Sequence, residues 1–84
     1  MICVYVLESL KDKKKYTGST VNLERRLKEH NKGYVEATSY RRPLKLLGYQ
    51  ECSTIEEAAR LEKKYKQSHD ALLRAIKSKL FILK

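Results

Sequence analysis

Arg26 and His30 are the first residues whose types and spacing could do chemistry. They lie four positions apart, so on a helix their side chains reach toward a common point. Tyr16 stands just before that helix, at the end of an expected strand, and Gly18 permits a sharp turn or close backbone approach there. A phenol, a guanidinium and an imidazole at one strand-to-helix corner suit chemistry at a phosphate group better than packing. The alternative is a solvated basic helix that carries one histidine.

Glu62 is the candidate carboxylate. In the helix expected after Thr54, the apolar positions Ile55, Ala58 and Ala59 form a stripe, and Glu62 continues it one turn after Ala58. A carboxylate that faces the core is costly unless it is paired or bound to a metal. Glu62 is therefore a possible metal ligand, and an ion pair with Lys66, one turn further on, is the structural alternative.

The elements that must position these residues follow from local patterns. Ile2 to Leu7 is a short apolar run typical of a strand buried on both faces, and Lys15 to Thr17 would pair with it as an antiparallel hairpin. Asn22 is a suitable N-cap for the helix that bears Arg26, and Gly33 suits the left-handed position after its end.

The second half of the chain predicts one more strand and two more helices. Residues 34–43 read as a loop, and 44–52 as a strand in which Gly48 indicates a bulge or close contact. A capped helix starts after Ser53 or Thr54, and 70–84 is a further helical segment with an apolar end, which either docks on the sheet or is exposed. Residues 1–84 are thus expected to form one α/β domain of the α+β type. It would have a three-stranded, mainly antiparallel sheet flanked by helices in the order β-β-α-β-α-α.

The formal net charge of +9 in 84 residues favours a polyanionic partner, most commonly a nucleic acid. The alternatives are a merely soluble basic protein and a protein that binds a membrane surface. The residues expected to contact a nucleic-acid backbone are Gly18, Arg25, Arg41, Arg42, Lys45 and Lys63. No apolar run is long enough to span a bilayer, and the start of the chain lacks the features of a secretory signal. Cytoplasmic residence without membrane association is the expectation.

Cys3 and Cys52 match no zinc-ligand spacing, and adding His30 or His69 does not create one. Both cysteines lie in apolar, strand-like segments, where a free cysteine behaves as a small buried hydrophobe. We expect two buried free thiols, because a disulfide is unusual in a reducing compartment.

Together these segments resemble the GIY-YIG endonuclease family. Its two name-giving tripeptides map to Cys3-Val4-Tyr5 and Tyr16-Thr17-Gly18, and Val4 and Thr17 keep the β-branched character of a strand. The family's arginine and histidine map to Arg26 and His30, and its metal-binding glutamate to Glu62 within R-L-E-K-K-Y-K. The similarity covers residues 2 to about 66, and L-E-R-R-L-K-E-H-N-K-G is especially like the small stand-alone bacterial members.

The resemblance implies a metal-dependent endonuclease that hydrolyses phosphodiester bonds in duplex or branched DNA, in repair, recombination or other nucleic-acid processing. Glu62 would hold Mg²⁺ or Mn²⁺, and Arg26 would bind the non-bridging phosphate oxygens. Tyr5 is the family-like general base, with Tyr16 and His30 as alternatives.

Two other functions remain open at this point. One is a non-catalytic nucleic-acid-binding module that keeps the fold, and the other is an interaction protein that dimerises through its apolar C-terminus. The chain would be a monomer or a weak homodimer. A partner protein could supply the specificity that so small a domain lacks.

Overall fold

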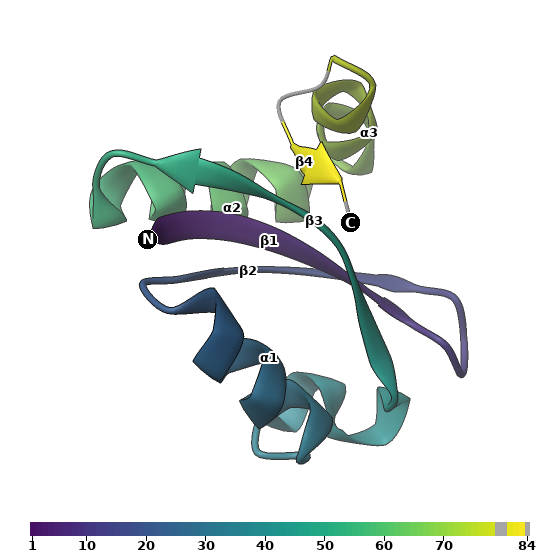
Figure 1. The fold of residues 1–84 in the computed structure, drawn as a ribbon. Helices are drawn as coiled ribbons and strands as arrows, with labels where there is room; N and C mark the ends of the chain where they lie inside the picture. The colour runs from purple at the N-terminus through teal and green to yellow at the C-terminus, as the bar shows by residue number, and fades with distance from the viewer. Residues whose placement is uncertain (79–80, 84) are drawn as a thin grey trace.

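The computed structural model describes residues 1–78 and 81–83. The described elements are β1 (Ile2–Ser9), β2 (Lys15–Thr20), α1 (Leu23–Asn31), the 3-10 helix η1 (Glu36–Arg41), β3 (Leu44–Cys52), α2 (Ile55–Gln67), α3 (His69–Lys77) and β4 (Ile82–Leu83). Their order confirms the α+β prediction, with an antiparallel sheet and flanking helices (Figure 1).

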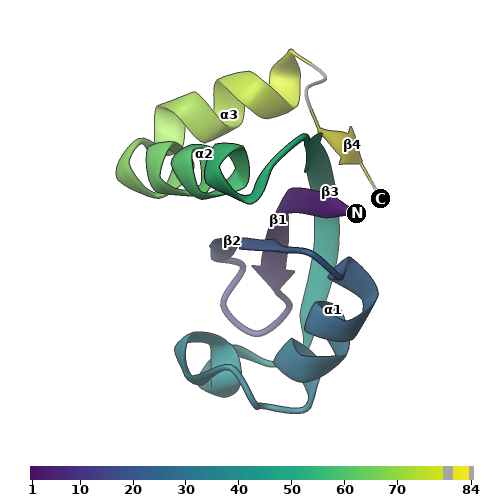
Figure 2. The ribbon, with the colours of Figure 1, turned by 90° about the vertical axis from the view of Figure 1, so that its left-hand side faces the viewer.

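β1 is the centre of the sheet, whose strand order is β2-β1-β3-β4 with antiparallel pairing throughout. Residues Cys3 to Leu7 are all buried, as their continuous apolar run predicts. Val4 and Val6 pack into one core cluster with residues of α2 and α3, whereas Tyr5 and Leu7 pack into a second cluster with residues of α1. The side view shows α2 and α3 on one side of the sheet and α1 on the other (Figure 2).

The expected helix signals are present. The Asn22 side chain accepts a hydrogen bond from the Arg25 backbone N–H at 3.1 Å, and Thr54 accepts one from the Glu57 N–H at 3.0 Å. Gly33 has φ +83°, and the paired bonds from Gly33 N–H to the His30 carbonyl and from Tyr34 N–H to the Glu29 carbonyl close α1. Within the described ranges, no helix is both long and apolar enough to cross a membrane.

η1 occupies part of the segment expected to be a loop, and hydrogen bonds hold its last residue and the two ends of the connection that contains it. The Ser9 hydroxyl at the end of β1 donates to the Arg41 carbonyl at 2.7 Å. The Asn31 side chain at the end of α1 bonds both the N–H and the carbonyl of Leu44, at 2.9 and 3.2 Å. These contacts fix the connection from α1 to β3.

The prediction of one helix over residues 70–84 was wrong. α3 ends at Lys77, Phe81 is buried against Tyr65 with ring centroids 5.6 Å apart, and Ile82–Leu83 pairs with β3 as β4. The free edge of β3 offers backbone hydrogen bonds that a continued helix could not use, so the apolar end docks on the sheet. Leu80 and Lys84, which were assigned to this helix, lie outside the described residues.

Two smaller expectations are confirmed. The register between β1 and β3 shifts between Val6, opposite Gly48, and Leu7, opposite Leu46, so the bulge lies directly beside Gly48. Cys3 and Cys52 are buried free thiols, and burial raises the pKa of each.

Candidate active site

His30 is the centre of the candidate site. It is 0% exposed, and its Nε2 lies 2.8 Å from the hydroxyl oxygen of Tyr5. The Tyr5 and Tyr16 rings both lie edge-on to the imidazole, with centroids 5.7 and 5.2 Å away. The fold therefore brings together three predicted site residues from β1, β2 and α1.

Gly18 makes room for the Tyr5 phenol. The two residues are direct partners across β1 and β2, and a Cβ added to Gly18 would lie 2.5 Å from the Tyr5 hydroxyl oxygen. The close approach expected at this glycine is thus made by a side chain of the protein itself, and Gly18 is buried. Any larger residue would push Tyr5 away from His30.

Burial keeps both members of the Tyr5–His30 pair uncharged at neutral pH. It lowers the pKa of His30 to about 4, and the positive charge of Arg26 acts in the same direction, partly offset by Glu29. It also raises the pKa of Tyr5 to about 12, although a hydrogen bond from Arg26 opposes this change. A neutral imidazole next to a neutral phenol can accept the phenol's proton.

Thr38 is a member of the site that the sequence analysis missed. It is 0% exposed, and its Oγ1 lies 2.7 Å from Nδ1 of His30. A threonine within a segment without periodicity gives no local signal, so only the folded position of η1 reveals this contact.

Arg26 and Arg25 point in different directions, as adjacent helical residues must. The Arg26 side chain is 38% exposed, pairs with Glu29 at 3.0 Å and interacts with the Tyr5 phenol. Arg25 is exposed to solvent. Of the two arginines, Arg26 is the one that borders the Tyr5–His30 pair.

Glu62 lies on α2, on the opposite side of the sheet from α1 (Figure 2). Its carboxylate accepts hydrogen bonds from the Ser19 hydroxyl at 2.5 Å and from Lys66 Nζ at 2.7 Å, and Lys66 Nζ lies 5.2 Å from the centroid of the Tyr16 ring. This contact is possible because β2 is an edge strand, so residues from α2 meet it beside Tyr16. The ion pair between Glu62 and Lys66, which the sequence offered as the alternative to a metal site, is therefore formed.

The oxygen atoms near Glu62 fit a loosely held hard cation. The Glu62 carboxylate and the Ser19 hydroxyl are both oxygen donors, and Mg²⁺ commonly uses one or two carboxylates with water and substrate phosphate as its other ligands. No group of three or more His, Cys, Asp or Glu side chains in residues 1–78 and 81–83 is arranged to hold a metal. A preformed protein cage is thus lacking in this part of the chain.

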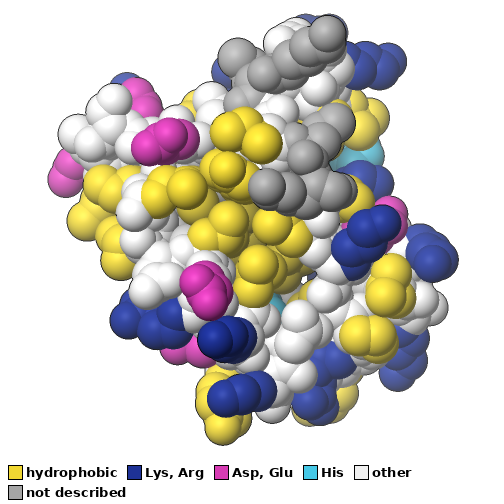
Figure 3. Space-filling model, in the orientation of Figure 1, with side chains coloured by type: hydrophobic (Ala, Val, Ile, Leu, Met, Phe, Trp, Pro, Cys, Tyr) yellow, Lys and Arg dark blue, Asp and Glu magenta, His cyan; other side chains and the backbone are white. Residues whose placement is uncertain are grey.

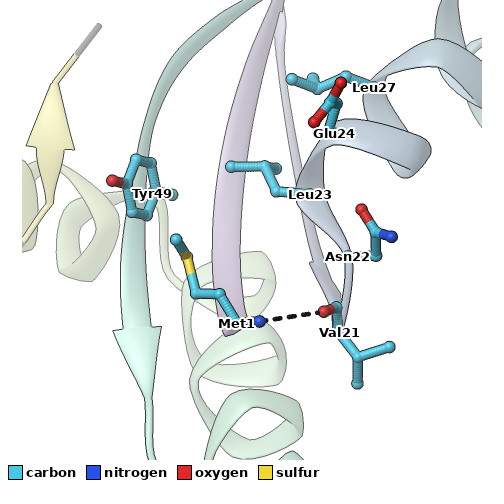
Figure 4. A pocket seen from close by; sticks show the side chains of 7 residues that line it. All are labelled: Met1, Val21, Asn22, Leu23, Glu24, Leu27 and Tyr49. Atoms are coloured by element: carbon cyan, nitrogen blue, oxygen red, sulfur yellow. Dashed lines mark hydrogen bonds between the residues drawn. The ribbon is translucent and has the colours of Figure 1, made fainter.

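The site is an open edge rather than a deep pocket. A hollow of about 220 Å³ runs beside it and is lined by Lys15, Tyr16, Thr17, Tyr65, Lys66, His69 and Leu72. A larger, mainly apolar hollow of about 510 Å³ lies near the N-terminus and is lined by Met1, Val21, Asn22, Leu23, Glu24, Leu27 and Tyr49 (Figure 4). It contains none of the predicted catalytic residues, so the basic hollow beside Tyr16 is the one that adjoins the chemistry.

The residues predicted to contact a nucleic-acid backbone differ in their exposure and in the partners they already have within the protein. Arg25, Lys45 and Lys63 are exposed. Arg41 pairs with Asp12 at 3.3 Å, and Arg42 donates to the Ser39 carbonyl at 2.9 Å while its guanidinium lies against Gly33. Arg41 and Arg42 therefore also hold η1 in place. On the face shown in Figure 3, Lys and Arg side chains lie along the lower half, below a central apolar area.

Comparison with known proteins finds one matching family model and several similar bacterial proteins. The family model described as "GIY-YIG catalytic domain" matches residues 1–76. A UPF0213 protein of Syntrophus aciditrophicus is 56% identical over 46 residues, which is 52% of each chain, so the match spans about half of that relative. A UPF0213 protein of Streptococcus pyogenes serotype M3 is 42% identical over 65 residues, covering 76% of this chain and 70% of the relative. No solved structure gives a significant match. Because the family model covers residues 1–76 of the 84, the chain belongs to the GIY-YIG family.

Proposed function

We propose that this protein is a metal-dependent endonuclease that hydrolyses phosphodiester bonds in DNA. The observation that carries the proposal is the hydrogen bond of Tyr5 to a buried, neutral His30, with Arg26, Tyr16 and Glu62 around it at the edge of the sheet. Packing alone does not require a buried phenol and a buried imidazole beside a partly exposed guanidinium and carboxylate, because burial of a polar group is costly.

Tyr5 and His30 act together as the proton acceptor. A neutral phenol can take a proton from water only if it passes on its own, and His30 Nε2 is 2.8 Å away to receive it. Tyr5 is 1% exposed, and its phenol oxygen accepts a hydrogen bond from Arg26. When Arg26 turns toward the phosphate, this position beside the phenol oxygen becomes available to water. Tyr16 is half-buried at the rim and orients the water or the phosphate.

Arg26 stabilises the charge that develops on the phosphate. Its planar guanidinium can donate two parallel hydrogen bonds to non-bridging oxygens, and its partial exposure leaves it accessible to a polymer. Lys15 and Lys66, which line the hollow beside Tyr16, would contact adjacent phosphates.

Glu62 and the Ser19 hydroxyl would hold Mg²⁺ or Mn²⁺, with Lys66 released from its ion pair toward the nucleic acid. Bound there, the ion would neutralise phosphate charge and favour departure of the 3′ oxygen. The donors fit such an ion because both are hard oxygen atoms at the rim of the site.

An open, basic site on a chain of net charge +9 suits a duplex or branched polymer bound through its backbone. These properties fit a role in repair, recombination or other processing, with specificity supplied by a partner protein. The rival function is a non-catalytic DNA-binding module. It is favoured by one observation, namely that Ser19 and Lys66 already occupy both oxygens of the Glu62 carboxylate.

The decisive experiment is a cleavage assay on duplex, flap and branched DNA, with Mg²⁺ or with EDTA. We expect cleavage only with the metal, and we expect Glu62→Ala to abolish it while DNA binding persists. Glu56→Ala, at an exposed position of the same helix, is the matched control and should cleave like the parent. If Glu62→Ala cuts as fast as the parent, the metal assignment is wrong. If the parent binds DNA but never cuts it, the binding-module function stands.

A further inference from the structure

Thr38 sits where it can control the hydrogen bonds of the site. It lies in η1, the connection between α1 and β3, and it is 0% exposed. Its Oγ1 lies 2.7 Å from His30 Nδ1 and 3.4 Å from the carbonyl oxygen of Val35. Thr38, His30 and Tyr5 thus form a continuous buried chain of polar atoms, which ends at the phenol oxygen.

Counting protons gives one fully satisfied arrangement of this chain. A neutral imidazole carries one N–H, and each hydroxyl carries one O–H. If Thr38 donates to the Val35 carbonyl, His30 Nδ1–H donates to Thr38 and Tyr5 donates to Nε2, so every donor has an acceptor.

The opposite arrangement leaves one buried proton without an acceptor. If Thr38 donated to Nδ1, then Nε2–H would donate to Tyr5, and the Tyr5 hydroxyl would need another acceptor. Among the described residues, the hydrogen bonds found for the Tyr5 hydroxyl are those with His30 and with Arg26, and Arg26 is a donor only. A buried donor without a partner is costly, so the first arrangement is the stable one.

We propose that Thr38 is a positioning residue that holds His30 in the Nδ1–H tautomer, so that Nε2 is the acceptor for the Tyr5 proton. The hydroxyl of Thr38 does this by accepting from Nδ1 while its own proton goes to the backbone. The catalytic consequence rests on the proposed function. The attacking water gives its proton to the Tyr5 oxygen, Tyr5 gives its own to Nε2, and His30 becomes an imidazolium whose Nδ1–H stays bonded to Thr38.

The tautomer can be measured without any substrate. In ¹⁵N-labelled full-length protein, long-range proton–nitrogen NMR spectra at neutral pH distinguish a protonated from an unprotonated ring nitrogen. We expect His30 to show protonated Nδ1 and unprotonated Nε2. His69, the other histidine of the chain, is exposed on α3 and serves as the internal reference for an unconstrained ring.

Three variants separate a tautomer effect from simple damage to the fold. Thr38→Ser keeps the hydroxyl and should keep both the tautomer and the cleavage rate, whereas the near-isosteric Thr38→Val should shift His30 toward Nε2–H. Tyr5→Phe removes the other partner and should leave Nδ1–H in place, because Thr38 sets the tautomer. This third variant keeps the proposal testable even if Thr38→Val does not fold.

The effect on cleavage should follow the tautomer. Loss of a partner that orients a metal-ligating histidine typically costs on the order of 10- to 100-fold in activity, and we expect a loss of similar size in kcat for Thr38→Val, with KM nearly unchanged. An Nε2–H tautomer in the parent, or an unchanged tautomer in Thr38→Val, overturns the proposal. Neither result would bear on whether the protein cleaves DNA, and a parent without nuclease activity would leave the tautomer assignment intact.

Discussion

At the scale of single residues, the adjacent arginines of α1 give the sharpest test of the site. Arg26 borders Tyr5 and His30, whereas Arg25 is exposed, since successive helical side chains point about 100° apart. An arginine that meets developing charge acts mainly in the transition state. A rim arginine that contacts a phosphate contributes mainly to affinity.

We therefore predict that Arg26→Ala lowers the single-turnover cleavage rate on the order of a hundredfold or more, with a small loss of DNA affinity. Arg25→Ala should do the reverse, with weaker, less salt-sensitive binding and a nearly normal rate at saturating enzyme. Equal losses in both variants would show that the helix face is assigned wrongly. An unchanged rate in Arg26→Ala would favour the binding module.

His30 also predicts how stability depends on pH. Its pKa is lowered to about 4 in the folded protein and is about 6.5 when unfolded, so the unfolded state binds more protons between these values. The free energy of unfolding should therefore rise with pH across this window and fall as the pH drops toward 4. The contribution of His30 is on the order of 3 kcal/mol.

Urea unfolding between pH 4.5 and 7.5 measures this dependence. His30→Gln should flatten the curve in that window, whatever its effect on the absolute stability. His69→Gln, at an exposed position, should leave the slope as in the parent. A parent curve that is flat over this window would contradict the buried, neutral state of His30.

At the scale of elements, the register of the β1–β2 hairpin creates the site. It sets Gly18 directly opposite Tyr5, and the phenol lies over the glycine. A methyl group at position 18 would occupy the space of the Tyr5 ring end, which is fixed by its bond to His30. The pairing of two strands thus determines where a catalytic phenol lies.

Gly18→Ala should accordingly destabilise the fold by about 1–3 kcal/mol, the usual cost of overpacking a core, and should abolish cleavage. Because the clash is with Tyr5, the double variant Gly18→Ala/Tyr5→Leu should lose less free energy of unfolding than the two single variants lose together. Thermal unfolding of the parent, both single variants and the double variant provides the cycle. Strict additivity would show that the glycine serves another purpose.

At the scale of the whole molecule, the net charge of +9 should govern binding to nucleic acid. Lys45 and Lys63 are exposed, whereas Arg41 and Arg42 also hold η1. We predict that Lys45→Ala and Lys63→Ala each lower the slope of log affinity against log salt by roughly one, with no loss of stability.

Arg42→Ala should lower the salt slope and also reduce stability, because it removes the bond to the Ser39 carbonyl. Titrations of a labelled duplex at several salt concentrations, without metal, measure the slopes, and urea unfolding measures stability. An affinity that does not change with salt would count decisively against a nucleic-acid partner.

The sequence by itself determined what depends on neighbours along the chain. Local rules about hydrogen bonds, φ angles and side-chain period account for the helix caps at Asn22 and Thr54, the left-handed Gly33 and the buried run Cys3–Leu7. The shared face of Arg26 and His30 likewise follows from the pitch of one helix. The order of the elements other than η1 and β4, and the shared helix face of Arg26 and His30, could therefore be predicted.

Only the tertiary structure decided what depends on contacts between distant segments. The bond of Thr38 to His30, the hydroxyl of Ser19 on Glu62 and the pairing of Ile82–Leu83 with β3 have no periodic signal in the sequence. The chain forms β4 rather than continuing the helix beyond Lys77. Pairing with the free edge of β3 and burial of Phe81 in the core stabilise this arrangement more than local helix propensity stabilises a helix. Such choices are made by packing and by the pairing of buried polar groups, which exist only once the whole chain has folded.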